Sequence, residues 1–210
     1  GRVFCVGGLG VDSIARMKLI GKEALEEGLG FRFGTRNLLV TFHPVTLEQN
    51  SSKRQMDELL SALADLPETH IIFTMSNADT DGRVLFGMVE DFVTIHPRAK
   101  AFVSLGQLHY LSCIQHVDAV VGNSSSGLAE VPSFRKGTIN IGDRQKGRIK
   151  AASVIDCEPE KDSILRALER LYADEFRVGL QTVKNPYGEG GASEAIVAIL
   201  EKVELEHILK

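Results

Sequence analysis

The strongest structural signal in the sequence is Ala119-Val-Val-Gly-Asn-Ser-Ser-Ser-Gly-Leu-Ala-Glu130. Its uninterrupted apolar start is typical of a strand buried on both faces of a parallel sheet. The Gly- and Ser-rich turn then opens a helix, where backbone N–H groups, hydroxyls and the helix dipole favour an anion. A serine N-cap beside a glycine turn is the simpler alternative, but three consecutive serines exceed what capping needs. The turn therefore indicates phosphate binding, without being a Walker A loop or a G-x-G-x-x-G fingerprint.

Apolar runs of strand length recur on both sides of this stretch. Most are continuous rather than alternating in polarity, and helical patterns lie between them. We therefore predict an α/β fold with a doubly wound, Rossmann-like parallel sheet. The predicted strands are Val3–Val6, Leu38–Phe42, Ile71–Met75, Ala101–Val103, Ala119–Val121 and Thr138–Ile141.

Apolar residues at helical spacing predict the connecting helices. Ser13 begins one that Gly28 or Gly30 would end, Ser51 caps the next, and a third includes Val84–Phe92. No strand is expected after Ile155, so the single domain would finish as a helical tail. The tail comprises Glu160–Tyr172, Asp174–Thr182 and Ala192–Leu205, the last with Ile196, Ile199, Leu200 and Val203 facing inward.

The composition is that of an ordinary globular chain of 210 residues, 43% hydrophobic and 25% charged. The net charge of −4 argues against nucleic acid as the main partner, since polyanion-binding proteins usually carry excess basic charge. Apolar runs fall far short of the roughly 18 residues that cross a bilayer, so no membrane association is expected. Cys5, Cys113 and Cys157 lack metal-ligand spacing and are interpreted as free thiols, which predicts a cytoplasmic protein without metal or cofactor. The start at Gly1, without methionine and directly before an apolar run, is typical of a fragment.

Candidate binding residues follow the predicted strands, because ligands of a doubly wound sheet bind beyond the carboxyl ends of its strands. His43, held by Pro44, is interpreted as a ligand-facing group or as a hydrogen-bonded loop histidine. Asn77 follows the next strand, where capping of the adjacent helix is the simpler role and donation to a ligand the alternative. After a further strand, backbone groups near Ser104 and Leu105 would read a base edge.

The loop Asn140-Ile-Gly-Asp-Arg-Gln-Lys-Gly-Arg148 also follows a strand directly. Arg144, Lys146 and Arg148 would clamp a diphosphate through bidentate hydrogen bonds, or they form a solvated basic turn. Glu130 lies one turn inside the helix after the serines, where a carboxylate accepts hydrogen bonds from sugar hydroxyls.

Four motifs follow one another along the chain: Thr41-Phe-His-Pro-Val-Thr46, Gly122-Asn-Ser-Ser-Ser-Gly127 with Glu130 and Pro132, Gly142-Asp-Arg-Gln-Lys-Gly-Arg148, and Asn185-Pro-Tyr-Gly188. Jointly they resemble the C-terminal half of UDP-N-acetylglucosamine 2-epimerases, over essentially all 210 residues. Non-hydrolysing members carry Gly-Gly in the serine turn and His-Arg after the strand. The Ser-Ser-Ser-Gly and His-Pro versions therefore resemble the hydrolysing branch that makes N-acetylmannosamine for sialic acid synthesis.

This resemblance implies a two-domain GT-B enzyme, in which residues 1–210 would be the nucleotide-binding C-terminal domain and the N-terminal domain is absent from this chain. Carried over by position, Ser124 and Ser125 would hold the diphosphate of a UDP-sugar, with Ser126 beside them. Glu130 would bind the ribose hydroxyls. The segment with Ser104 and Leu105 would bind the uracil, and Asn77 matches a position that contacts ligand in animal relatives.

The implied reaction eliminates the nucleotide diphosphate across C1–C2 to give 2-acetamidoglucal, to which water then adds. His43 and Arg144 would act in catalysis by stabilising the leaving diphosphate. The family's acid and base carboxylates lie in the N-terminal domain, so this chain alone is expected to bind nucleotide weakly without turnover. The resemblance leaves open UDP or GDP, the sugar, and a homodimer. Two alternatives remain, the donor domain of a GT-B glycosyltransferase and a non-catalytic nucleotide-sugar sensor.

Overall fold

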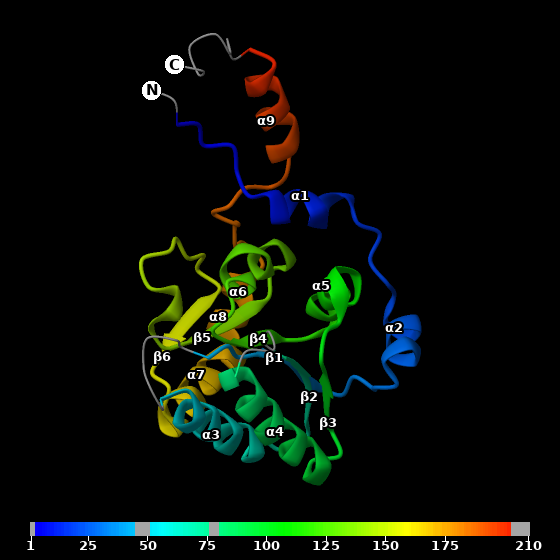
Figure 1. The fold of residues 1–210 in the computed structure, drawn as a ribbon, viewed down its shortest axis with the longest axis vertical. Helices are drawn as coiled ribbons and strands as arrows, with labels where there is room; N and C mark the ends of the chain where they lie inside the picture. Colours follow the sequence, from blue (N-terminus) through cyan, green and yellow to red (C-terminus); the bar gives the residue numbers. More distant parts are fainter. Residues whose placement is uncertain (1–2, 45–50, 76–79, 203–210) are drawn as a thin grey trace.

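The computed structural model describes residues 3–44, 51–75 and 80–202, and its centre is a six-stranded sheet (Figure 1). All neighbouring strands are parallel, and their order is β3-β2-β1-β4-β5-β6. The predicted doubly wound α/β fold is therefore confirmed. The strands are β1 (Arg36–Thr41), β2 (Thr69–Thr74), β3 (Ala99–Phe102), β4 (Ala119–Gly122), β5 (Gly137–Ile141) and β6 (Val154–Cys157).

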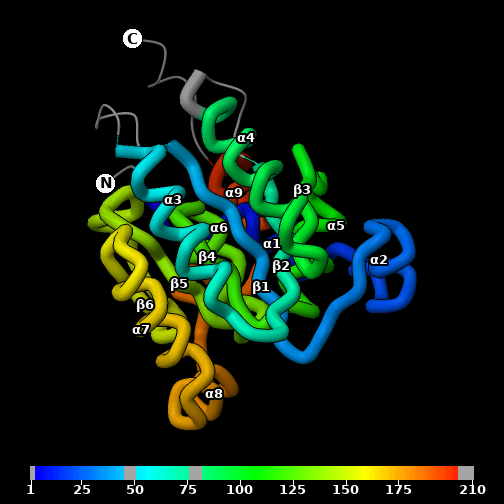
Figure 2. Tube along the Cα trace, turned by 90° about the horizontal axis from the view of Figure 1, so that it is seen from below, coloured from blue at the N-terminus to red at the C-terminus, as the bar shows by residue number. Residues whose placement is uncertain are grey.

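Helices cover both faces of the sheet, because the central strands are apolar on both sides. One core lies between the sheet and α3 (Ser51–Ala64), α4 (Thr80–Ile95) and α7 (Lys161–Tyr172), the side seen in Figure 2. The other core packs the opposite face against α2 (Lys22–Leu29) and α5 (Gly106–His116). The remaining elements are α1 (Leu9–Arg16), α6 (Ser126–Ala129), the 3₁₀ turns η1 (Val131–Phe134) and η2 (Asp143–Gln145), α8 (Asp174–Leu180) and α9 (Ala192–Leu200).

The first predicted strand, Val3–Val6, is wrong. This segment forms no strand, and the side chains of Val3 and Phe4 are 95% and 56% exposed. Just beyond it, a Cβ on Gly7 would lie 3.8 Å from that of Ala192 at the start of α9, and the N–H of Gly8 donates to the carbonyl of Tyr187. The sixth strand is instead β6, which pairs with β5 at the edge and has a half-buried pattern that an apolar-run criterion misses.

The predicted helix from Ser13 to Gly28 or Gly30 is two helices, α1 and α2. Between them the N–H of Ile20 donates to the hydroxyl of Ser112 on α5, and α2 begins after Gly21. Gly30 ends α2 with a left-handed φ of 55°, as helix C-caps often do.

The other predicted helices are present, but α8 ends at Leu180 rather than Thr182 and α9 at Leu200, since 201–202 form a turn and 203–205 lie outside the described residues. The tail is also less buried than expected. In α9, Ile196 and Ile199 are half-buried, whereas Leu200 is 65% exposed, so it does not face inward. Val203 lies outside the described residues. Within the described ranges, no helix has the length and apolar character that crossing a membrane requires.

Candidate functional site

The carboxyl ends of β1, β4 and β5 form one corner of the molecule. Thr41, Gly122 and Asn140 lie side by side in the sheet register, so the loops that follow these strands meet. Successive strands are added outward from β1 in one direction and from β4 in the other, which makes this junction the topological switch point where such sheets bind ligands. The segments with His43, Ser124–Ser126 and Arg144 follow these strands and are therefore brought together.

Gly122 allows β1 and β4 to approach closely at this corner. Its φ is +136°, and a Cβ added there would lie 2.0 Å from the carbonyl oxygen of Thr41. Any larger residue would meet backbone, which cannot move as a side chain can. The glycine in the Gly-Asn-Ser motif is therefore a packing requirement of the strand junction.

Asn123 connects the three loops. Its Oδ1 accepts the N–H of His43 at 2.7 Å, and its Nδ2 donates to the carbonyl of His43 at 2.9 Å. Its own carbonyl accepts from Arg144 Nη1 at 3.0 Å and from Gln145 Nε2 at 2.8 Å. Asn123 and Gln145 are almost fully buried, so this network is shielded from water. The sequence reasoning gave no role to either residue, although an Asn directly after a buried strand was a signal for such backbone pairing.

The serine turn and Glu130 form a second network. Ser126 N donates to Ser124 Oγ at 3.4 Å, and the Ser126 hydroxyl donates to Glu130 Oε2. Among described residues, neither the N–H nor the hydroxyl of Ser125 has a hydrogen-bond partner. The helix that the turn opens, α6, is only one turn long, so backbone N–H groups and hydroxyls contribute more to anion binding than a helix dipole can.

Tyr110 supports this second network from α5. Its hydroxyl donates to Ser126 Oγ at 2.9 Å, and burial raises the pKa of Tyr110 to about 12, so the phenol stays protonated. The glycine-rich start of α1 also approaches, since a Cβ on Gly10 would lie 3.4 Å from Glu130 Oε1. Nothing in the local sequence marked Tyr110, because its contact spans two separate elements.

The remaining predicted residues lie at the same edge or outside the described chain. Ser104 and Leu105 follow the edge strand β3. Ser104 is exposed and its hydroxyl accepts the N–H of Gly106, whereas Leu105 is buried. Arg144 is exposed apart from its bond to Asn123, and His43 is half-buried. Asn77 lies outside the described residues.

The cysteines contribute no reactive thiolate to this corner. Burial raises the pKa of both Cys113 and Cys157 to about 12, which disfavours the nucleophilic thiolate. Cys5 is exposed in the N-terminal segment. In the described part of the chain, no group of three or more His, Cys or carboxylate residues is placed to hold a metal ion.

The loop at Asn185 contacts the segments that follow β4 and β5. Asn185 Nδ2 donates to the carbonyl of Ala129 and to the hydroxyl of Ser133, and the Tyr187 hydroxyl donates to the carbonyl of Ile149. These contacts give the Asn-Pro-Tyr-Gly motif a structural role, since it links the end of α6 to the loop after η2.

Comparisons with known proteins identify the family of the chain. Residues 1–201 match the UDP-N-acetylglucosamine 2-epimerase family. The polysialic acid biosynthesis protein P7 of Escherichia coli is 39% identical over 96% of this chain and 51% of its own length. The GDP/UDP-N,N'-diacetylbacillosamine 2-epimerase (hydrolyzing) of Campylobacter jejuni is 36% identical over 84% of this chain and 46% of its own length. The chain thus spans about half the length of the curated relatives it matches.

The fold also matches a solved structure. UDP-GlcNAc 2-epimerase from Methanocaldococcus jannaschii, in complex with UDP-GlcNAc and UDP, superposes with a TM-score of 0.70 at 19% identity. The match covers 95% of this chain and 55% of that one. At this identity the likeness supports the fold, which is the Rossmann-like half of a GT-B architecture.

Proposed function

Because the chain belongs to the UDP-N-acetylglucosamine 2-epimerase family, we propose that its 210 residues are the nucleotide-sugar-binding C-terminal domain of a hydrolysing 2-epimerase. The observation that carries this proposal is the network at Asn123, which joins the His43, serine-turn and Arg144 loops at the switch point of the sheet. Hydrolysing relatives at 36% and 30% identity favour that branch.

The diphosphate is assigned to the serine turn. The N–H and hydroxyl of Ser125, which lack partners among described residues, supply donors, and the exposed Arg144 supplies positive charge. Glu130 binds the ribose hydroxyls, because hydrogen bonds to Ser126 hold its carboxylate beside the turn. Ser104 and Leu105 contact the base at the end of β3.

For the reaction, this chain contributes stabilisation of the leaving group. Elimination across C1–C2 of the sugar places negative charge on the departing diphosphate, which Arg144 and the turn donors neutralise. His43 stands on the adjoining loop, where its imidazole can donate a hydrogen bond to the same diphosphate. The base that removes the C2 proton and the acid that returns it are assigned to the other half of the full-length enzyme, so this chain alone binds nucleotide without turning it over.

Isothermal titration of the 210-residue chain with UDP tests the proposal, with GDP as a parallel titrant because one relative is named for both nucleotides. We expect heat of binding, and about tenfold weaker affinity for Glu130→Ala, the loss of one or two charged hydrogen bonds. Glu169→Ala, which removes an exposed carboxylate on α7, is the matched control and should leave affinity unchanged. Absence of heat with both nucleotides, or equal affinities for the two variants, would contradict the assignment.

A further inference from the structure

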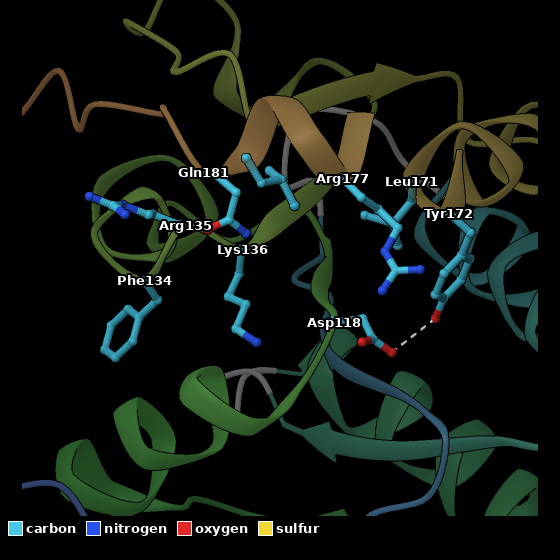
Figure 3. Close-up of a pocket in the computed structure, with 9 residues that line it drawn as sticks. Asp118, Phe134, Arg135, Lys136, Leu171, Tyr172, Arg177 and Gln181 are labelled. Atoms are coloured by element: carbon cyan, nitrogen blue, oxygen red, sulfur yellow. Dashed lines mark hydrogen bonds between the residues drawn. The ribbon is translucent and has the colours of Figure 1, made fainter. Parts of the chain in front are cut away.

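A pocket lies at the amino ends of the strands, opposite the carboxyl ends that carry the candidate site. It has a volume of about 350 Å³ and collects residues that precede β4 and β5 together with the ends of α7 and α8 (Figure 3). Since strands run in parallel, the amino ends that border this pocket are remote from the carboxyl ends that carry His43 and the serine turn. Its lining, termed the basic pocket below, is Asp118, Phe134, Arg135, Lys136, Leu171, Tyr172, Arg177, Leu180 and Gln181.

Cationic side chains outnumber carboxylates in the basic pocket. Arg135, Lys136 and Arg177 contribute positive charge, and Asp118 is the single acidic residue of the lining. In Figure 3 the side chains of Lys136 and Arg177 extend toward the side on which Asp118 lies, while Arg135 points away from it. Within the described residues, no hydrogen bond or ion pair holds any of these three cationic groups. The chain as a whole carries a net charge of −4, so the local excess runs against the overall balance.

Asp118 is already engaged in the fold. Its Oδ2 accepts the backbone N–H of Asn37 at 2.7 Å and the hydroxyl of Tyr172 at 3.3 Å. The guanidinium of Arg36 stacks over the Tyr172 ring, 4.5 Å from the centroid, which fixes this wall of the pocket. Asp118 therefore neutralises only part of the charge that Lys136 and Arg177 bring.

Lys136 carries an energetic cost in this arrangement. Burial lowers its pKa, and the charge of Asp118 offsets that effect only in part. A bound anion would restore interactions that the desolvated ammonium lacks. The helix dipole favours a cation such as Arg177 in the last turn of α8. Lys136 has no such stabilisation, because it lies outside any helix, directly before β5.

We propose that the basic pocket binds a small phosphomonoester, with Lys136 and Arg177 on the phosphate. The amide of Gln181 provides a further polar group, and the apolar walls of Leu171, Leu180 and Phe134 face the organic part of the ligand. The pocket volume lies within the range of small-molecule sites. Most of its lining residues are polar or charged, which suits a small ligand that carries a phosphate. The site is independent of the nucleotide proposal, because it shares no residue with it.

Titration of the 210-residue chain with glucose 6-phosphate tests this proposal, with calorimetry and amide chemical shifts as the two measurements of binding. We expect saturable binding that weakens with added salt, with shifts at Lys136 and Gln181 and none at Ser124–Gly127. Inorganic phosphate measures the phosphate contribution alone, and glucose, which lacks the charge, should not bind. Equal binding of glucose, or saturable shifts confined to the serine turn, would overturn the proposal.

Charge-removing variants assign the binding to named residues. Lys136→Met and Arg177→Met keep the apolar stems and should each weaken glucose 6-phosphate binding about tenfold, the loss of one charged hydrogen bond. Arg98→Met is the matched control. Arg98 is an exposed cation that directly precedes β3, so it lies at the amino ends of the strands like the pocket, but on an outermost strand of the sheet. If Lys136→Met fails to fold, the exposed Arg177→Met alone decides. Affinity of that variant equal to the Arg98→Met control would refute the site.

Discussion

Replacement of Asn123 by alanine removes the side chain that joins the loops after β1 and β4. The native amide makes two hydrogen bonds to the backbone of His43, at 2.7 and 2.9 Å, and only 1% of the residue is exposed. The variant removes both hydrogen bonds to the partly buried backbone of His43, at about 1–3 kcal/mol each. We therefore expect unfolding to require about 2–6 kcal/mol less free energy, a large share of the roughly 5–15 kcal/mol of a typical domain.

Urea denaturation measures this loss as a lower midpoint with an unchanged slope. Asn140→Ala is the matched control, because Asn140 is as buried as Asn123 and pairs in register with the neighbouring Gly122. Its amide, however, donates only to Asp156, which also binds Lys150. The control should cost only about 1 kcal/mol. An unfolding free energy of Asn123→Ala within about 0.5 kcal/mol of the native value, well below the cost of one lost buried hydrogen bond, would refute this role of Asn123. A loss equal to that of the control would refute it too.

Further predictions address the strand junction, the Glu130 network and the chain termini. Gly122→Ala should lower the free energy of unfolding by about 2–5 kcal/mol, because its Cβ meets the Thr41 carbonyl at a positive φ; Gly87→Ala on α4, with nothing within 4 Å of the added Cβ, should instead stabilise slightly in the same urea assay. Tyr110→Phe removes the donor to Ser126 and should weaken UDP binding severalfold in calorimetry with little change in the far-ultraviolet circular dichroism; unchanged affinity would remove Tyr110 from the site. Hydrogen bonds from Ser193 and Ala192 lower the pKa of Asp12 from 3.8 to about 2. The stability that the ionised carboxylate contributes above about pH 4 should therefore fall as the pH approaches 2. Asp12→Asn should flatten this part of the profile of melting temperature against pH, and a profile identical to that of the native chain would contradict the assignment.

The sheet was predictable where local sequence decides burial. Continuous apolar runs mark strands covered on both faces, and this held for Leu38–Phe42 and Ala119–Val121. The same criterion failed at Val3–Val6, because an apolar run alone does not show whether a neighbouring strand is available to pair with it. It also missed β6, where an edge position leaves Asp156 in contact with solvent.

The site was predictable in its position but not in its bonding. The rule that ligands bind beyond strand carboxyl ends brought His43, the serines and Arg144 to one corner, because parallel strands share an edge. The bonds that hold the corner, from Asn123 to His43 and from Tyr110 to Ser126, join residues 80 and 16 positions apart. The basic pocket also combines residues from separate segments of the chain, so no local sequence motif predicts it.

The proposal of a nucleotide domain is most directly decided by an amide chemical-shift titration of the 210-residue chain with UDP. The account predicts saturable shifts at Ser124–Gly127 and at His43 and Arg144, since these groups surround the assigned diphosphate. Amides that border the basic pocket, such as Lys136, should stay unchanged at low UDP. Saturation of the basic pocket before the serine turn, or no shift at the serine turn at all, would contradict the account.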